Sequence, residues 1–286
     1  MLQRSTIQLL RFHFSLFLLP VYLFALSQLP NIYTGRAILI FFILHVLVYP
    51  SSNGYNSYMD RDETPIGGLS KPMQPTRQLF IVSVAMDLLA ILISFTISFY
   101  FATGILIYIL ASRAYSYRGI RLKKYPVTGY LVVALCQGAL IFFLTYHGAG
   151  QQPLSSVPVL PAIAASCLIG GYYPLTQIYQ HEEDARDGVR TISLLLGKRG
   201  TFLFCGTVFA IATLIMFFTF KEQGSLRFFW IFIVCMSPMA LFFSNWMMQV
   251  WKDGQAANFR KSLATNLLAS VCTSVCFLII IILKQF

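Results

Sequence analysis

Nine long apolar runs limit what this chain can fold into more than any other feature. They span residues 8–29, 36–57, 78–99, 101–117, 127–147, 158–180, 201–220, 227–249 and 263–284. A helix of about 20 apolar residues is long enough to cross the hydrocarbon core of a bilayer. Only 11% of the residues are charged, whereas a soluble domain carries about 25%. We therefore predict an all-α integral membrane protein with a bundle of nine transmembrane helices.

Basic residues are distributed unevenly among the segments that connect these runs. If the N-terminus lies inside, all but four of the 21 Lys and Arg residues fall in inner segments. The exceptions are Arg36, Lys221, Arg227 and Lys284. Because basic loops stay on the cytoplasmic side of a membrane, this asymmetry predicts a cytoplasmic N-terminus. A basic surface beside anionic membrane lipid also accounts for most of the net charge of +11, so no nucleic-acid partner is expected.

No linker or low-complexity stretch divides the chain, and we predict one membrane domain over residues 1–286. All six cysteines lie inside apolar runs, and none forms a Cys-x-x-Cys pair. They are expected to pack as small buried side chains rather than to bind a metal. An acidic cluster followed two helices later by a basic loop occurs twice, about 120 residues apart. This repetition suggests two related halves packed around a central cavity.

Seven of the ten acidic residues fall in two short clusters, each directly after an apolar run. The first cluster contains Asp60, Asp62 and Glu63, and the second contains Glu182, Glu183, Asp184 and Asp187. Carboxylates near a bilayer are costly, so a pair of such clusters predicts a functional site. With the predicted orientation, both clusters face the cytoplasmic side of the membrane.

Helical spacing arranges these acidic residues into stripes, because residues three, four and seven apart share one helix face. The first stripe is Asn53, Asn56, Asp60 and Glu63, and the second is Thr176, Gln180, Asp184 and Asp187, with Gly188 as a helix stop. Two facing stripes would present oxygen ligands to one point, which suits Mg²⁺ bound together with substrate phosphates. Cationic partners for a diphosphate are available on the same side at Arg118, Arg121, Lys123, Lys124, Arg190 and Lys198.

These motifs resemble those of the UbiA-type intramembrane prenyltransferases. The family's first aspartate-rich motif, Asn-Asp-x-x-Asp-x-x-x-Asp, falls on Asn56-Ser57-x-x-Asp60-x-x-x-Thr64. Its second motif, Asp-x-x-x-Asp, falls on Gln180-x-x-x-Asp184. The segment from Tyr115 to Lys123 is similar to the family's loop after the fourth helix, and the resemblance covers nearly the whole chain. It implies nine transmembrane helices and two motifs that bind Mg²⁺ and a prenyl diphosphate.

The resemblance implies an enzyme that moves an isoprenoid chain from a prenyl diphosphate to a hydrophobic acceptor, commonly an aromatic quinone precursor. Asp60 and Asp184 are then the predicted catalytic residues. The predicted ligands of Mg²⁺ are Asp60, Glu63, Asp184 and Asp187. The predicted substrate contacts are Asn56, Tyr115, Arg118, Arg121, Lys123, Gln180 and Arg190. The expected location is a bacterial inner membrane, which the chain crosses several times and where it contacts lipid.

Three positions depart from the family pattern, because Ser57, Thr64 and Gln180 stand where the family has aspartate. Part of the metal coordination could pass to carboxylates within one helical turn: Asp62, Glu63, Glu183 and Asp187. The departures leave open weaker metal binding, a different prenyl donor or a loss of activity. A second hypothesis is therefore a non-catalytic family member that binds isoprenoid lipid or a partner protein. A transporter is a third, but it predicts acidic residues in mid-membrane rather than at the boundary.

Overall fold

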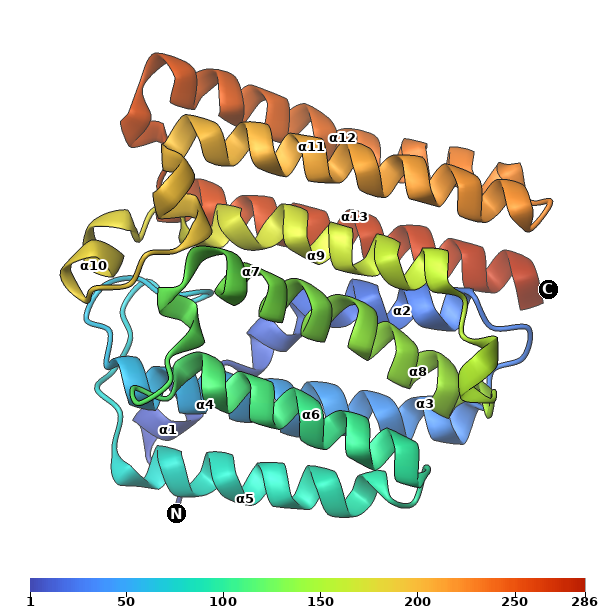
Figure 1. Ribbon diagram of the computed structural model, residues 1–286, viewed down its shortest axis with the longest axis horizontal. Coiled ribbons are helices and arrows are strands. Elements are labelled where there is room, and N and C mark those ends of the chain that lie inside the picture. The colour runs from blue at the N-terminus through green and yellow to red at the C-terminus, as the bar shows by residue number, and fades with distance from the viewer. Residues whose placement is uncertain (286) are drawn as a thin grey trace.

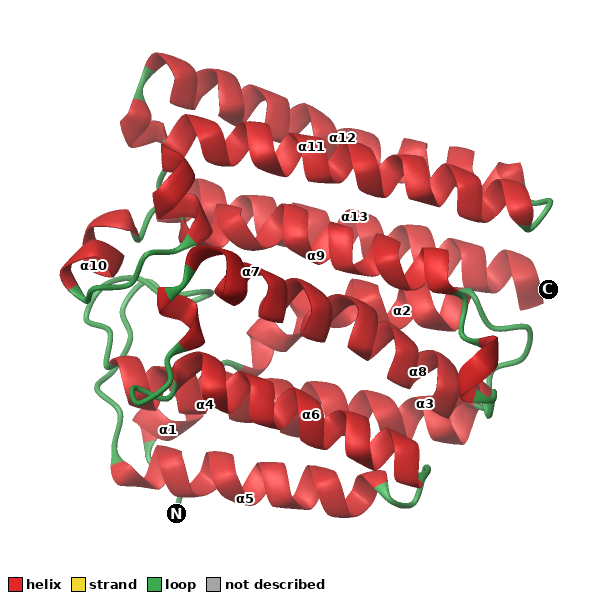
Figure 2. Cartoon of the chain, in the orientation of Figure 1, coloured by secondary structure: helices red, strands yellow, loops and turns green. Residues whose placement is uncertain are grey.

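The computed structural model describes residues 1–285, which form a bundle of helices that run along a common direction (Figure 1). Within these residues there is no β-strand, and the chain consists of helices and loops (Figure 2). The prediction of an all-α fold is confirmed. Large apolar side chains such as Leu92, Trp230 and Leu241 are exposed on the outside of the bundle. Such a surface suits hydrocarbon, because lipid tails solvate apolar side chains as well as a protein core does.

The first two spans are each built from three helical pieces. The first span contains α1 (Arg4–Leu10), the 3₁₀ helix η1 (Phe12–Leu18) and α2 (Leu19–Ser27). The second contains α3 (Thr34–Phe41), the π-helix η2 (Phe42–Val48) and α4 (Tyr49–Asp60). Arg11 separates α1 from η1 with a left-handed backbone φ of 48°. The chain therefore changes direction at Arg11.

The remaining spans follow in sequence order. Helices α5 (Arg77–Ser94) and α6 (Phe99–Ser116) are followed by the short 3₁₀ helix η3 (Leu122–Lys124). The next span joins α7 (Pro126–Ala134), the π-helix η4 (Leu135–Leu140) and α8 (Ile141–Gly150). After η5 (Leu154–Ser156) come α9 (Val159–Gln177) and the short α10 (His181–Arg186). The chain ends with α11 (Ile192–Glu222), α12 (Leu226–Lys252), η6 (Gly254–Ala256) and α13 (Phe259–Gln285).

Eight helical segments within residues 1–285 are long and apolar enough to cross a membrane. They correspond to eight of the nine predicted runs. The run at 101–117 is the exception. It forms α6, whose last turns carry the polar residues Ser112, Arg113 and Ser116. Helix α6 packs against α4 and α5 within the bundle. Its passage through the membrane stays a prediction, as does the cytoplasmic position of the N-terminus.

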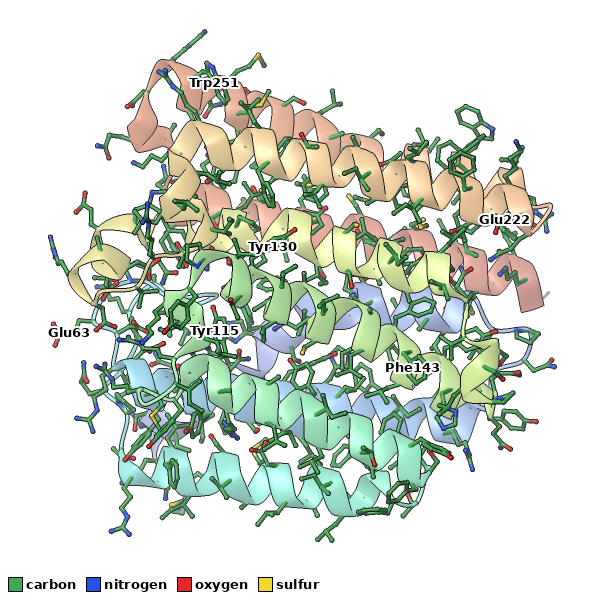
Figure 3. All side chains as sticks on the ribbon, in the orientation of Figure 1. Glu63, Tyr115, Tyr130, Phe143, Glu222 and Trp251 are labelled. Carbon is green, nitrogen blue, oxygen red and sulfur yellow. The ribbon has the colours of Figure 1, made fainter. Side chains whose placement is uncertain are left out.

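The end of α4, the loop that follows it, and α10 carry the acidic clusters and lie at one end of the bundle (Figure 1). We call this the carboxylate end; it contains segments 61–76, 117–125 and 178–191. Successive spans run in alternating directions, so every second connection returns to this end. Glu63 lies here, whereas Glu222 lies at the opposite end of the bundle (Figure 3).

Two spans approach each other very closely at the π-helix η4. Gly138 in η4 faces the backbone of Ser166 in α9, and a Cβ added to Gly138 would lie 2.4 Å from the Ser166 Cα. The Ser166 hydroxyl accepts a hydrogen bond from the Ala139 N–H at 2.9 Å. In the widened turn of a π-helix, some backbone N–H groups lack a good hydrogen-bond partner within the helix. The absence of a side chain at Gly138 and the hydroxyl of Ser166 therefore stabilise this turn.

Replacing Gly138 with alanine is expected to lower the midpoint of thermal unfolding in detergent. The new Cβ meets backbone atoms, so α9 must shift, at a cost of about 1–3 kcal/mol. Gly206 in α11 is a matched control, because the nearest atom to its added Cβ is 3.8 Å away. Gly206→Ala should leave the midpoint unchanged or raise it, since alanine favours helix. Equal midpoints for the two variants would contradict the close approach of η4 and α9.

Candidate active site

A cavity of about 290 Å³ connects the carboxylate end with the middle of the bundle. Its polar wall is formed by Arg11, Asn53, Asn56, Asp60, Asp62, Lys123, Gln180 and Asp184. Its deeper wall is apolar and aromatic and includes Phe14, Phe17, Val21, Phe24, Leu168, Ile169, Tyr172 and Tyr173. A charged entrance and an apolar interior suit a ligand with an anionic head and a hydrocarbon tail.

Helix α4 supplies the first group of polar side chains. Asn53, Asn56 and Asp60 lie three and four residues apart, and all three line the cavity. The Asn56 amide donates to Asp60 Oδ2 at 2.8 Å and to Ser116 Oγ at 3.1 Å. The Asp60 side chain is 4% exposed, and its Oδ1 is buried without a hydrogen-bond partner. A buried carboxylate oxygen in this state favours a bound cation.

Helix α4 ends before the predicted polar stripe does. Arg61 adopts a left-handed backbone conformation with a φ of 57°, and the helix stops at Asp60. Glu63 therefore leaves the helix face and is exposed, outside the cavity wall. Asp62 lines the cavity in its place. The prediction that Glu63 continues the stripe of α4 is wrong, because the helix no longer exists at that residue.

The second acidic stripe is also interrupted. Helix α9 ends at Gln177 and α10 begins at His181, so the predicted continuous helix through the second cluster is wrong. Gln180 lies at the break, lines the cavity and donates from its amide to the Pro65 carbonyl at 3.2 Å. This bond connects the two acidic segments across the entrance.

Asp184 lies in α10 and lines the cavity. Its Oδ2 accepts a hydrogen bond from the Thr191 hydroxyl at 3.4 Å. Gly188, with a φ of 67°, follows α10 and confirms the predicted helix stop. After the break that follows α9, Asp184 lines the same cavity as Asp60 at the end of α4.

Segment 117–125 brings three basic side chains to these carboxylates, and of the three only Lys123 lines the cavity. Its Nζ lies 2.6 Å from Asp60 Oδ2. Arg121 pairs with Asp187 and lies 3.7 Å from Asp60 Oδ1. Arg118 is about half exposed and lies 3.8 Å from Asp187. Asp187 therefore faces two guanidinium groups and is not part of the cavity wall.

Arg190 and Tyr115 complete the predicted substrate contacts. The Arg190 side chain is exposed and lies outside the cavity wall. Tyr115 lines the cavity, and its hydroxyl is paired with that of Tyr173. The Gln177 amide donates to the Tyr173 hydroxyl at 2.7 Å. Tyr115 lies towards the carboxylate end of the bundle (Figure 3), and both rings line the same cavity as the carboxylates.

Arg11 is a cavity residue that the sequence analysis did not single out. It is 6% exposed, and its guanidinium donates to the Gly67 carbonyl at 3.2 Å and to the Asn53 carbonyl at 3.3 Å. Its Nε is buried without a partner. The left-handed turn at Arg11 directs the side chain between α4 and loop 61–76. The available signal was a single arginine inside the first apolar run.

The carboxyl groups at the cavity entrance are held in an unfavourable environment. Burial, together with the nearby charge of Asp60, raises the pKa of Asp62 to about 6. Burial raises the pKa of Asp184 to about 7, while Lys123 opposes the shift. Desolvated acids that repel one another are typical of sites that bind a cation or do chemistry.

The fold and this site can be compared with known proteins. The model of the UbiA prenyltransferase family matches residues 15–268. The chain belongs to the UbiA prenyltransferase family. UbiA-family members are prenyltransferases, and the apolar helices together with the family make this chain an integral membrane protein. Its placement in a bacterial inner membrane stays a prediction. No curated protein sequence matches the chain.

Solved structures share the UbiA fold with this chain. A UbiA homologue from Archaeoglobus fulgidus bound to DMAPP and Mg²⁺ has a TM-score of 0.73 and 20% identity, covering 97% of this chain and 99% of that one. The same homologue bound to GPP and Mg²⁺ has a TM-score of 0.73 and 21% identity, with the same coverage. A UbiA homologue from Aeropyrum pernix K1 has a TM-score of 0.70 and 19% identity, covering 94% and 98%.

The residues of this UbiA-family site can be tested for their fit to Mg²⁺. Within residues 1–285, no three His, Cys, Asp or Glu side chains form a group that would hold a metal by themselves. Asp60, Asp62 and Asp184 offer carboxylate oxygens at one cavity end, and Asn56 and Gln180 add amide oxygens. Mg²⁺ prefers such oxygen ligands and usually takes one or two carboxylates with water and substrate phosphate. The donor set therefore fits Mg²⁺ bound jointly with a diphosphate.

Replacing Arg11 with methionine is expected to loosen loop 61–76. The change removes two charge-assisted hydrogen bonds to backbone carbonyls, each worth about 1.5–3 kcal/mol. We expect trypsin to cleave after Arg61 faster in the variant than in the wild type, as followed by mass spectrometry. Arg4→Met is the control, because Arg4 is exposed and its loss removes the same charge. Identical cleavage rates in the two variants would exclude an anchoring role for Arg11.

Proposed function

We propose that this protein transfers an isoprenoid chain from a prenyl diphosphate to a hydrophobic acceptor in a Mg²⁺-dependent reaction. The observation that supports this most directly is the convergence of Asp60, Asp62, Asp184 and Lys123 at the charged end of an apolar cavity. The structures of the Archaeoglobus fulgidus homologue contain DMAPP or GPP together with Mg²⁺. A prenyl diphosphate has the anionic head and apolar tail that this cavity can hold.

Asp60 and Asp184 are the proposed metal-holding residues. When bound, Mg²⁺ would neutralise diphosphate oxygens and make the diphosphate a better leaving group. Asn56 orients Asp60 through its 2.8 Å hydrogen bond. Gln180 donates through its amide nitrogen to Pro65, which leaves its carbonyl oxygen available to a ligand. Asp62 is the nearest additional carboxylate on the cavity wall.

The cationic side chains of the cavity are proposed to bind the diphosphate directly. Lys123 and Arg11 both line the entrance and would stabilise negative charge as it develops on the departing group. Lys123 would exchange its contact with Asp60 for one with the diphosphate when the metal binds. Arg118, Arg121 and Arg190 lie around this entrance, and their role in substrate binding stays a prediction.

The reaction follows from this arrangement. The bond between the prenyl C1 and the diphosphate oxygen breaks, and its electron pair leaves with the diphosphate. The faces of Tyr115 and Tyr173 lie just beyond the carboxylates and would stabilise positive charge on the allylic carbons. The acceptor nucleophile then bonds to C1 and loses a proton. The apolar walls exclude water, which would otherwise capture the cation. We propose an aromatic quinone precursor as the acceptor.

The departures from the family motif are compatible with activity. Ser57 is buried within α4 and Thr64 is exposed, and neither lines the cavity. Asp62 supplies a cavity carboxylate between these two positions. The alternative is a non-catalytic member that binds isoprenoid lipid or a partner protein. It is favoured by the lack of a three-ligand metal group within residues 1–285.

A non-hydrolysable geranyl diphosphate analogue is expected to raise the melting temperature of the purified protein only when Mg²⁺ is present. Asp60→Asn and Asp184→Asn should each abolish this shift, measured from the melting temperature of the same variant without ligand. Glu222→Gln is the control, because Glu222 is exposed at the opposite end of the bundle. A wild-type shift that survives chelator and both substitutions would favour the non-catalytic lipid-binding alternative.

The two outlying predicted metal ligands give a separate prediction. Glu63 is exposed and Asp187 pairs with Arg121, so both lie outside the cavity wall. We expect Glu63→Gln and Asp187→Asn to reduce the Mg²⁺-dependent rise in melting temperature that the analogue causes. The reduction should be smaller than the one caused by Asp60→Asn. Titration of Mg²⁺ at a fixed analogue concentration measures this order. If Glu63→Gln reduced the Mg²⁺-dependent rise in melting temperature as much as Asp60→Asn does, loop 61–76 would have to move inward when metal binds.

A further inference from the structure

A group of uncharged polar side chains lines the cavity well beyond the carboxylates. They are Ser52 on α4, Tyr108 and Ser112 on α6, and Gln137 on η4. Ser52 precedes Asp60 by just over two turns of the same helix, which places it about 12 Å deeper at 1.5 Å per residue. Diphosphate binding at the carboxylate end makes no use of side chains at this depth.

These side chains face one another across the contact between three helices. The Ser112 hydroxyl donates to Ser52 Oγ at 2.9 Å. The Tyr108 hydroxyl lies against both Gln137 and Ser52. A glutamine amide has two donor hydrogens and an acceptor oxygen. Tyr108 lies against the Gln137 amide and Gln137 lines the cavity, so the remaining hydrogen-bonding groups of the amide are available to a ligand.

Hydrogen-bonding groups at this depth require a partner. Polar side chains that line this cavity can be satisfied by water, and a ligand that displaces the water without replacing its hydrogen bonds loses affinity. An isoprenoid chain offers no hydrogen-bonding atom. A ligand that carries a hydroxyl or a carbonyl oxygen would satisfy Gln137 and Tyr108 together. The polar patch therefore fits the second substrate better than it fits the prenyl tail.

The charge of the patch limits what that ligand can carry there. The nearest charged side chains, Asp87 and Arg113, pair with each other and with Ser51 behind the wall. Neither lines the cavity. No cation is therefore available at this depth to bind a carboxylate, whose burial without a counter-charge is strongly unfavourable. The patch fits a neutral oxygen.

Another part of the wall is apolar. It is formed by Val21 and Phe24 of α2 and by Leu168 and Ile169 of α9, while α13 contributes Asn266, Ser270 and Thr273 besides Ala269. An isoprenoid chain can lie against this wall while an aromatic ring lies against the polar patch. The close contact of Gly138 with Ser166 fixes the turn of η4 that carries Gln137. The position of the amide is thus set by backbone packing.

We propose that Ser52, Tyr108, Ser112 and Gln137 form the acceptor subsite, and that they bind a neutral hydroxyl or carbonyl oxygen on an aromatic acceptor. This inference rests on the proposed prenyl transfer and specifies its second substrate. The acceptor's reacting carbon would point towards the carboxylate end, and its neutral oxygen would point into the bundle. A second oxygen of the ring system is therefore part of what the site recognises.

Calorimetric titration with 1-naphthol and with 1-methylnaphthalene tests the subsite, because the two probes have nearly the same shape and differ in the hydroxyl. Both titrations use the full chain in detergent, with and without the geranyl diphosphate analogue and Mg²⁺. We expect tighter binding of 1-naphthol to the wild type. Gln137→Leu and Tyr108→Phe should each weaken 1-naphthol binding about tenfold, the effect of one lost buried hydrogen bond. Binding of 1-methylnaphthalene should not change.

Asn266→Leu is the matched control, since Asn266 lines the same cavity on α13 and should leave 1-naphthol binding unchanged. Equal affinity of the wild type for the two probes would overturn the proposal. Unchanged 1-naphthol affinity in both Gln137→Leu and Tyr108→Phe would do the same. If the analogue gives no Mg²⁺-dependent shift, the proposed function fails by itself, and the titration without analogue still decides whether the subsite exists.

Discussion

The burial of Asp60 against Lys123 is the interaction on which the rest of this site depends. Asp60 is at the last residue of α4, and Lys123 comes from η3, yet their charged atoms are 2.6 Å apart. An unpaired carboxylate at this depth would be strongly destabilising, so the pair fixes segment 117–125 over the end of α4. That arrangement gathers Asp62 and Asp184 around the same point. In such a site a metal ion can replace Lys123 as the cation that neutralises Asp60.

Backbone conformation at the carboxylate end serves the same purpose. Among the described residues, Arg11, Arg61 and Arg121 all have positive φ values, a conformation that costs free energy for any residue with a Cβ. Each of them ends a helix or precedes one. The resulting sharp turns bring the Arg121 side chain to Asp60 and the Arg11 side chain to the Asn53 carbonyl. Strained turns are therefore concentrated where charged groups must converge.

The cavity presents charged groups at its entrance and uncharged groups deeper inside. Charged residues lie at the entrance, and the deeper part is lined by aromatic, aliphatic and uncharged polar side chains. The charged groups at the entrance are buried but compensated, since Asp60 contacts Lys123 and Arg11 donates to two backbone carbonyls. This gradient lets one cavity hold a diphosphate, a hydrocarbon chain and an aromatic ring without placing a charge in hydrocarbon.

The sequence by itself determined the helical membrane fold, the positions of the spans and the acidic clusters, because hydrophobic length and charge placement are local properties. It also placed Asn56, Asp60, Gln180 and Asp184 at the site, on motif spacing. Only the tertiary structure decided which other side chains line the cavity beside these four residues. Helix α4 stops at Asp60, so Asp62 replaces Glu63 on the cavity wall. Arg121 forms an ion pair with Asp187. Arg11, from the first span, lines the cavity because of its left-handed backbone conformation. Helix ends and ion pairing depend on contacts between distant segments, which spacing along one segment cannot reveal.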